Sequence, residues 1–211
     1  SDKPQTTRNK ILCVLTQDDA QILFIDTPGI HKPKHKLGEY MVKAAENTLK
    51  EVDVILFVVD ATENIGAGEL YIMERLQSTQ APVILVVNKV DQINKQQVLP
   101  VISRYSDKLN FVGAIPISAK EKTNLDQLVE EIKKYLEEGP QYYPSDMITD
   151  QPERLVIGEL IREKALHLTK EEIPHAIAVD IEEISKRNND DLYIRATIYV
   201  ERESQKGIVI G

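Results

Sequence analysis

Three short polar motifs in this chain each follow a run of apolar residues. They are Asp26-Thr27-Pro28-Gly29, Asn88-Lys89-Val90-Asp91 and Ser118-Ala119-Lys120. Short apolar runs that end in polar or turn-forming residues predict buried strands. Open α/β sheets place their ligands in the loops at the carboxyl ends of such strands. We therefore expect the three motifs to lie along one edge of a sheet, where their side chains can act on a single ligand.

The first motif carries groups that suit magnesium and phosphate. Asp26 can hold Mg²⁺ through water, because hard cations take oxygen ligands. Gly29 has no Cβ, so its backbone N–H can approach a phosphate closely. The same residues also form an ordinary turn, since Pro and Gly are typical turn residues. By itself, this motif leaves both interpretations open.

The second and third motifs suit a guanine base. Asp91 can accept two hydrogen bonds from guanine N1–H and N2–H₂, which adenine does not present. The methylene stem of Lys89 can cover the ring while Asn88 braces the loops, and the Ala119 N–H can donate to guanine O6. Each motif taken alone is also an ordinary polar turn. The occurrence of all three in this order, each at a strand end, favours a guanine-nucleotide site.

The elements that must position these motifs alternate between strand and helix. Strands are predicted at 10–15, 21–25, 54–59, 82–87 and 113–117, and helices at 39–49, 68–77, 95–107 and 124–138. The first two strands are joined by a turn and predict a hairpin. The run Val54–Val59 is continuously apolar, which predicts a central parallel strand covered on both faces. The alternation predicts an α/β fold with a doubly wound, mostly parallel sheet.

A smaller unit follows this sheet. Residues 139–149 contain glycine and proline, interrupt the alternation and predict a linker. Beyond the linker we expect a helix over 150–168 and then a hairpin of two strands at 175–184 and 192–202, which is an α+β pattern. The expected division is a first domain at 1–138, a linker at 139–149 and a second domain at 150–211.

Composition limits the class of protein. The net charge of −8 argues against a protein coated with basic residues for nucleic acid, so any RNA binding must rest on a local site. The single cysteine, Cys13, lies in an apolar run, and we expect it to be buried in the core. One buried thiol cannot build a disulfide framework, which indicates a reducing cytoplasm. No apolar run approaches the length of a membrane helix.

The motifs resemble those of a known family. The three motifs above are similar to the third, fourth and fifth motifs of the translation-factor-like P-loop GTPases, and Pro4-Gln5-Thr6-Thr7-Arg8 is similar to their second, switch I motif. The second half narrows the resemblance to the Era family of TrmE-Era-EngA-like GTPases, which carry a C-terminal type II KH domain. The segments that carry this resemblance are Tyr143-Pro144, Ile148–Gln151, Ile161–Lys164, Ile173–His175 and Val200–Lys206 with Ile208–Gly211.

The resemblance implies a function. It implies a protein that binds and hydrolyses GTP, binds 16S ribosomal RNA and acts in assembly of the small (30S) ribosomal subunit. The implied cofactors are GTP or GDP, Mg²⁺ and K⁺, and the implied location is the cytoplasm, with peripheral association at the inner face of the cell membrane. An alternative is an RNA-binding scaffold whose G domain binds nucleotide but hydrolyses it poorly. A GTPase of tRNA modification is disfavoured, because the second half lacks the helical domain of that family.

The resemblance also assigns roles by position. Thr7, or its neighbour Thr6, would reach Mg²⁺ and the γ-phosphate, and Asp26 would hold Mg²⁺ through water. Thr27 and Pro28 belong to the same nucleotide-binding motif, and the Gly29 N–H would contact the γ-phosphate. Thr7 and Gly29 are therefore the expected catalytic residues, and Asp26 and Thr7 the expected metal ligands. The expected guanine-binding residues are Asn88, Lys89, Asp91, Ser118, Ala119 and Lys120.

The residue after Gly29 bears on the expected rate of hydrolysis. Many GTPases place there the glutamine that orients the attacking water, but this chain has Ile30. An alkyl side chain cannot orient water. We therefore expect slow intrinsic hydrolysis, with the water positioned by backbone groups or by a bound K⁺.

Two family features are expected beyond the ends of the sequence. The Gly-x-x-x-x-Gly-Lys-Ser phosphate loop occurs nowhere in the chain and is expected N-terminal to residue 1. Gly211 resembles the first glycine of the KH Gly-x-x-Gly loop, which contacts RNA. We therefore expect a G domain at 1–138 without its phosphate loop and the N-terminal part of a KH domain at 150–211.

Overall fold

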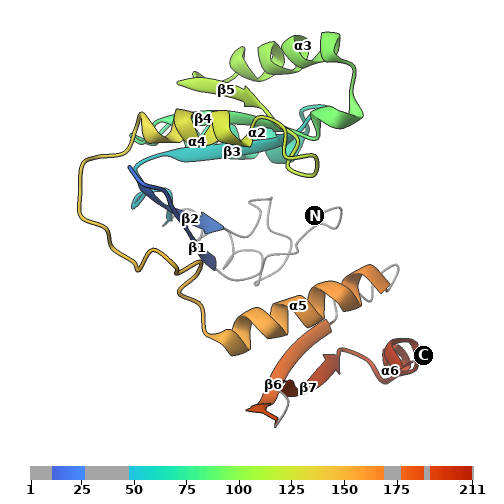
Figure 1. The fold of residues 1–211 in the computed structure, drawn as a ribbon. Coiled ribbons are helices and arrows are strands. Elements are labelled where there is room, and N and C mark those ends of the chain that lie inside the picture. The colour runs from blue at the N-terminus through green and yellow to red at the C-terminus, as the bar shows by residue number, and fades with distance from the viewer. Residues whose placement is uncertain (1–10, 27–47, 169–176, 188–190, 211) are drawn as a thin grey trace.

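A computed structural model of the 211-residue chain describes residues 11–26, 48–168, 177–187 and 191–210. Figure 1 shows the arrangement of the elements, with a parallel sheet and its helices in the first half and a helix with a hairpin in the second.

The parallel sheet contains β3 (Ile55–Asp60), β4 (Val83–Asn88) and β5 (Gly113–Pro116), in the order β3-β4-β5. Val83 to Val87 of β4 are all buried, as expected for a strand that is covered on both faces. The predicted central position of 54–59 is wrong within the described residues, because β3 forms the edge of this three-stranded sheet. Its Val58 side chain is 55% exposed, so one face of β3 is only partly covered.

Helices cover both faces of this sheet, which confirms the doubly wound α/β class. The helices are α2 (Ala67–Leu76), α3 (Lys95–Ser106) and α4 (Leu125–Lys133). Alternate residues of β4 point to opposite faces. Val83, Leu85 and Val87 pack with α2 and α3, whereas Ile84 and Val86 pack with α4.

Most predicted boundaries in this half agree with the structure to within two residues. The exception is the helix predicted at 124–138, which ends at Lys133. Beyond it, the Tyr135 N–H bonds to the Ile132 carbonyl, so the chain tightens into a turn instead of continuing the helix. Most of the helix predicted at 39–49 lies outside the described residues.

The predicted N-terminal hairpin is confirmed as β1 (Ile11–Thr16) and β2 (Gln21–Asp26), which pair antiparallel. Among the described strands it forms a sheet of its own. Ile22 packs with Ile84 and Val86 in the cluster under α4, so the hairpin is attached to the parallel sheet through side chains. The ammonium of Lys133 lies 2.8 Å from an Asp19 carboxylate oxygen and links α4 to the hairpin turn.

Cys13 does not lie in the core, so the prediction of a buried thiol is wrong. The next residue of β1, Val14, is buried at 7% exposure, because neighbouring residues of a strand face opposite sides. Cys13 also pairs through its backbone with Thr149, which lies in the segment between the two halves.

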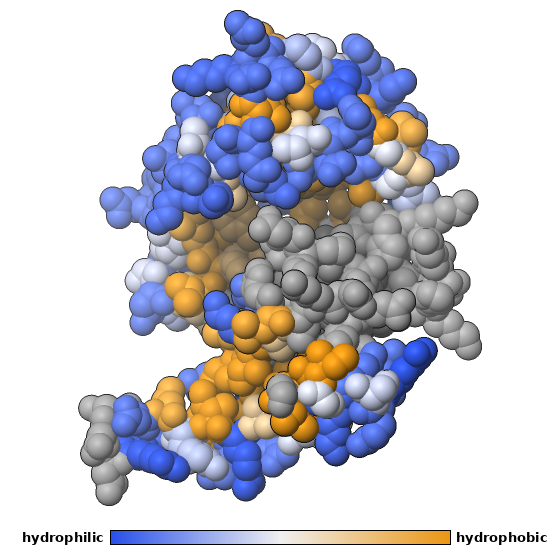
Figure 2. All heavy atoms as spheres, turned by 90° about the vertical axis from the view of Figure 1, so that its right-hand side faces the viewer, coloured by the Kyte–Doolittle hydropathy of each residue, from blue (hydrophilic) through white to orange (hydrophobic). Residues whose placement is uncertain are grey.

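The second half contains α5 (Glu153–Leu168), β6 (Ile177–Lys186), β7 (Leu192–Val200) and α6 (Glu203–Ile210). The predicted helix and hairpin are confirmed, and α6 is an element that was not predicted. Arg154 of α5 donates to the Ile181 carbonyl of β6, and Ile177 and Ile181 of this strand are buried. Apolar side chains also gather on the surface of this half (Figure 2). No helix of the described ranges is long and apolar enough to cross a membrane.

Candidate functional site

The carboxyl ends of the three parallel strands bring the second and third polar motifs together. Asp60 at the end of β3 lies opposite Asn88 at the end of β4, and Val87 lies opposite Pro116 of β5. Because these strands run in the same direction, the loops that follow them emerge on one edge of the sheet. Residues distant in sequence therefore form a single site.

Asn88 connects the loops of this site. Its side-chain oxygen accepts the N–H of Lys89 at 2.8 Å and the N–H of Ala119 at 3.1 Å. Its backbone carbonyl accepts the N–H of Ala61, which follows β3, at 2.8 Å. One residue thus holds the loops after all three strands. The Ala119 N–H that was expected to reach guanine O6 is directed at Asn88 here.

Asp91 lies beside Ser118. It belongs to a 3₁₀ turn, η1 (Val90–Gln92), and its Oδ1 accepts a 2.6 Å hydrogen bond from the Ser118 hydroxyl. The same hydroxyl oxygen accepts the Glu121 N–H at 3.1 Å, and Ser118 is only 1% exposed. A buried hydroxyl therefore fixes the orientation of an exposed carboxylate. A carboxylate has acceptor capacity for further donors, so Asp91 can still bind paired N–H groups.

Lys89 turns back toward β3. Its φ of 65° lies in the left-handed region, and its ammonium lies 2.7 Å from Asp60 Oδ2. Asp60 Oδ1 accepts both the N–H and the hydroxyl of Thr62. Burial raises the pKa of Asp60, but the hydrogen bonds from Lys89 and Thr62 outweigh this effect and hold the pKa below its ordinary value. The carboxylate is therefore ionised at neutral pH.

The loop after Ser118 is a compact turn. Ser118 and Thr123 exchange backbone hydrogen bonds in both directions. Asn124 has a φ of 59° and donates from its side chain to the Pro116 carbonyl at 2.8 Å, which ties the start of α4 to β5. Lys120 lies at the exposed tip of this turn, where its side chain is 80% exposed.

The first motif is only partly described. Asp26 ends β2 with an exposed side chain. Thr27, Pro28, Gly29 and Ile30 lie outside the described residues, as do Thr6, Thr7 and Gly211. The described part of the chain contains no cluster of three or more potential metal ligands. The structure thus brings together the residues expected around guanine. The positions of the residues expected around the γ-phosphate and the RNA stay predictions.

Asp60 is a residue of this site that was not predicted. Like Asp26, it directly follows a run of apolar residues, and this pattern was a signal for it. Its contact with Lys89 was not visible in the sequence, because it depends on the register of β3 against β4 and on the backbone turn at Lys89.

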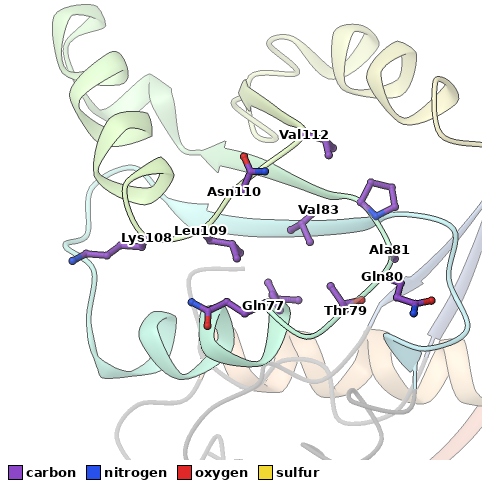
Figure 3. A pocket seen from close by; sticks show the side chains of 11 residues that line it. Gln77, Thr79, Gln80, Ala81, Val83, Lys108, Leu109, Asn110 and Val112 are labelled. Carbon is purple, nitrogen blue, oxygen red and sulfur yellow. The ribbon is translucent and has the colours of Figure 1, made fainter.

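A separate cavity of about 420 Å³ lies at the opposite end of the sheet. Figure 3 shows its lining side chains, which come from the segments that lead into β4 and β5. Val83, the first residue of β4, lines it, whereas Asn88 at the other end of the same strand belongs to the site. The cavity is therefore distinct from the site described here.

Two protein-family models match the chain. A family described as 50S ribosome-binding GTPase matches residues 1–89, and the KH domain family matches residues 172–211. The two matches fall on the two halves seen in the structure.

Solved structures of Era proteins are similar to the whole chain. A crystal structure of Era in complex with MgGDPNP and nucleotides 1506–1542 of 16S ribosomal RNA shares 45% identity, with a TM-score of 0.93. That alignment covers 100% of this chain and 72% of the other. A variant of Aquifex aeolicus Era bound to GDP and AlF₄⁻ also shares 45% identity, with a TM-score of 0.92, and the alignment covers 100% of this chain and 73% of that one.

A more distant likeness concerns the fold alone. Translation elongation factor SelB from Methanococcus maripaludis, in complex with a GTP analogue, shares 14% identity with a TM-score of 0.51. That alignment covers 94% of this chain and 47% of the other.

Proposed function

The chain belongs to the Era family of GTPases, and from this premise we propose that it binds and hydrolyses GTP, binds 16S ribosomal RNA and acts in assembly of the small ribosomal subunit. The observation that carries the proposal is the hydrogen bond from Ser118 to Asp91, which orients a carboxylate at the carboxyl edge of a parallel sheet. Relatives with 45% identity bind GDP or GDPNP, and one binds the RNA.

The guanine base is recognised by the loops after β4 and β5. Asp91 accepts the N1–H and N2–H₂ of guanine, while the hydrogen bond from the Ser118 hydroxyl keeps the Asp91 carboxylate oriented. Lys89 covers the ring with its methylene stem, and Asn88 holds the loops around it. The Ala119 N–H, which bonds to the Asn88 side chain in the structure, donates to guanine O6 as well when the base is bound. Lys120 belongs to the same guanine-binding loop.

The phosphates and Mg²⁺ are bound by the segments around β2. Asp26 holds Mg²⁺ through water, and an exposed carboxylate at a strand end is a suitable oxygen donor for this ion. Thr7, or Thr6, would complete the ligand set. Thr27 and Pro28 would belong to the nucleotide-binding motif, and the Gly29 N–H would contact the γ-phosphate. When bound, Mg²⁺ neutralises charge on the phosphates. Because Ile30 cannot orient water, hydrolysis would be slow, with the water positioned by backbone groups or by a bound K⁺.

The second half binds RNA as a type II KH domain. We divide the chain into a G domain at 1–138, a linker at 139–149 and the KH part at 150–211. The gap between the end of α4 at Lys133 and the start of α5 at Glu153 supports this division. Gly211 would contact the RNA backbone. With a net charge of −8, RNA binding by these 211 residues depends on a local surface and not on overall charge. The proposed location is the cytoplasm, with peripheral association at the cell membrane.

One experiment tests the proposal and its alternative. The affinity of the full-length protein for GTP and GDP, and its turnover of GTP, are measured in K⁺ and in Na⁺, with and without the 3′ end of 16S RNA. We expect binding of guanine but not adenine nucleotides, slow turnover that K⁺ raises, and binding of the RNA. Nucleotide and RNA binding without turnover would support the scaffold alternative, and absence of guanine-nucleotide binding would overturn both.

A further inference from the structure

Asp60 is held in one orientation at the edge of the guanine site. Its two carboxylate oxygens have different partners. Oδ1 accepts the Thr62 N–H at 2.9 Å and the Thr62 hydroxyl at 2.6 Å, and Oδ2 lies 2.7 Å from the Lys89 ammonium. The side chain is 25% exposed, so this ion pair is partly shielded from water. The carboxylate is therefore a fixed anchor and not a freely rotating surface group.

Lys89 is held by this anchor at its far end. Its backbone N–H bonds to Asn88, its φ of 65° turns the side chain toward β3, and its ammonium is bound by Asp60. A free lysine side chain samples many rotamers and loses this freedom when it packs against a ligand. With both ends held before the ligand arrives, less of this entropy is lost on binding.

We infer that Asp60 is a positioning residue for the nucleotide: it holds the Lys89 ammonium so that the methylene stem is ready to cover the guanine ring. This inference rests on the proposed function, because it assigns the lysine stem to the base. Asp60 acts through Lys89 and does not itself touch the nucleotide. The hydrogen bonds that keep the pKa of Asp60 low support it, since they keep the carboxylate charged at neutral pH.

A purely local structural role for Asp60 makes a different prediction. If the carboxylate only stabilised its turn through Thr62, its loss would act in the same way whatever residue stood at position 89. The variant Asp60→Asn separates the two roles, because the amide oxygen can still accept from Thr62 but no longer attracts the lysine. Asp60→Glu keeps the charge and is the conservative variant.

The test is a double-mutant cycle in the full-length protein. The affinity for fluorescent GDP is measured for wild type, Asp60→Asn, Lys89→Ala and the double variant, with thermal unfolding as a check on folding. Glu63→Gln is the matched control, since Glu63 is an exposed carboxylate in the same loop. We expect Asp60→Asn to lower the affinity for GDP about 10-fold. The affinity of the double variant should lie within about 2-fold of that of Lys89→Ala. Asp60→Glu should recover part of the loss, and Glu63→Gln should bind like wild type.

The outcomes distinguish this inference from the proposed function. Equal GDP affinity of Asp60→Asn and wild type would overturn the inference while the function stands. A further 10-fold loss on adding Asp60→Asn to Lys89→Ala would also overturn it, because the two residues would then act independently. If wild type itself fails to bind GDP, the proposed function fails.

Discussion

The Ser118 hydroxyl donates a 2.6 Å hydrogen bond to Asp91 Oδ1 across 27 positions of sequence. Ser118 is 1% exposed, whereas Asp91 is exposed, so a buried donor orients a carboxylate that solvent and ligands can reach. The bond joins the loop after β4 to the loop after β5. Specificity for the base should depend on both residues.

Asp91→Asn should change the base preference of the site from guanine to xanthine. The amide loses an acceptor for the guanine N1–H and N2–H₂ and gains a donor for the O2 of xanthine. Hydrogen bonds to a charged group contribute about 1.5–3 kcal/mol each, so loss of the pair should weaken GDP by about 100-fold or more. Competition titration of GDP against xanthosine diphosphate measures this change in relative affinity. A variant that retains the wild-type preference would show that Asp91 does not contact the base.

Ser118→Ala should lower the affinity for GDP less than Asp91→Asn does. The Asp91 carboxylate remains but loses its orienting donor, and the Glu121 N–H loses its acceptor. Because Ser118 acts on the base only through the orientation of Asp91, we expect a smaller loss of GDP affinity, of about 5-fold, which is about 1 kcal/mol. Isothermal titration of the variant measures it. Ser106→Ala at the end of α3, away from this site, is the matched control, and an equal loss there would contradict the specific role of Ser118.

Asn88→Ala should destabilise the fold as well as the site. The N–H groups of Lys89 and Ala119 lose their acceptor, and an unsatisfied polar group costs about 1–3 kcal/mol where water cannot replace the partner. Urea unfolding measures the change in the free energy of unfolding. Asn110→Ala, in the exposed segment before β5, should change it by less than about 0.5 kcal/mol. Equal stability of both variants would refute the bracing role.

Gln21→Ala should release Tyr142 and Tyr143, in the segment between α4 and α5, from the hairpin. The Gln21 amide accepts the N–H groups of Tyr142 and Tyr143 and donates to the Tyr143 carbonyl at 2.9 Å. Figure 1 shows this segment passing beside β1 and β2. Hydrogen exchange at the two tyrosine amides should become about 10-fold faster. Gln17→Ala in the hairpin turn should leave both rates unchanged, and unchanged rates in Gln21→Ala would contradict the attachment.

The stability contribution of Asp60 should depend on pH. The pKa of this carboxyl is lower in the folded protein than the ordinary value of about 3.9, so its interactions with Lys89 and Thr62 stabilise the fold above that pH. The contribution is lost as the pH falls through the folded-state pKa. The difference in free energy of unfolding between wild type and Asp60→Asn should therefore be constant near neutral pH and vanish in acid. A difference that grows in acid would contradict the sign of this shift.

Much of the candidate site followed from local sequence patterns. An apolar run that ends in a polar motif predicts both a strand and the end of that strand where ligands bind, because burial and turn chemistry act over a few neighbouring residues. This reasoning located Asn88, Asp91 and Ser118 on one edge of a sheet before their contacts were known.

Other features depended on contacts between distant residues. An apolar run does not determine which strand lies at the centre of a sheet or which face is covered. For this reason the predictions of a central strand at 54–59 and of a buried Cys13 were wrong among the described residues. The ion pair of Asp60 with Lys89 required the register of β3 against β4 and a left-handed backbone at Lys89. The sequence by itself determined most of the elements and the polar residues at their ends. Only the tertiary structure decided the partners, because strand pairing and side-chain packing join residues that are far apart in the chain.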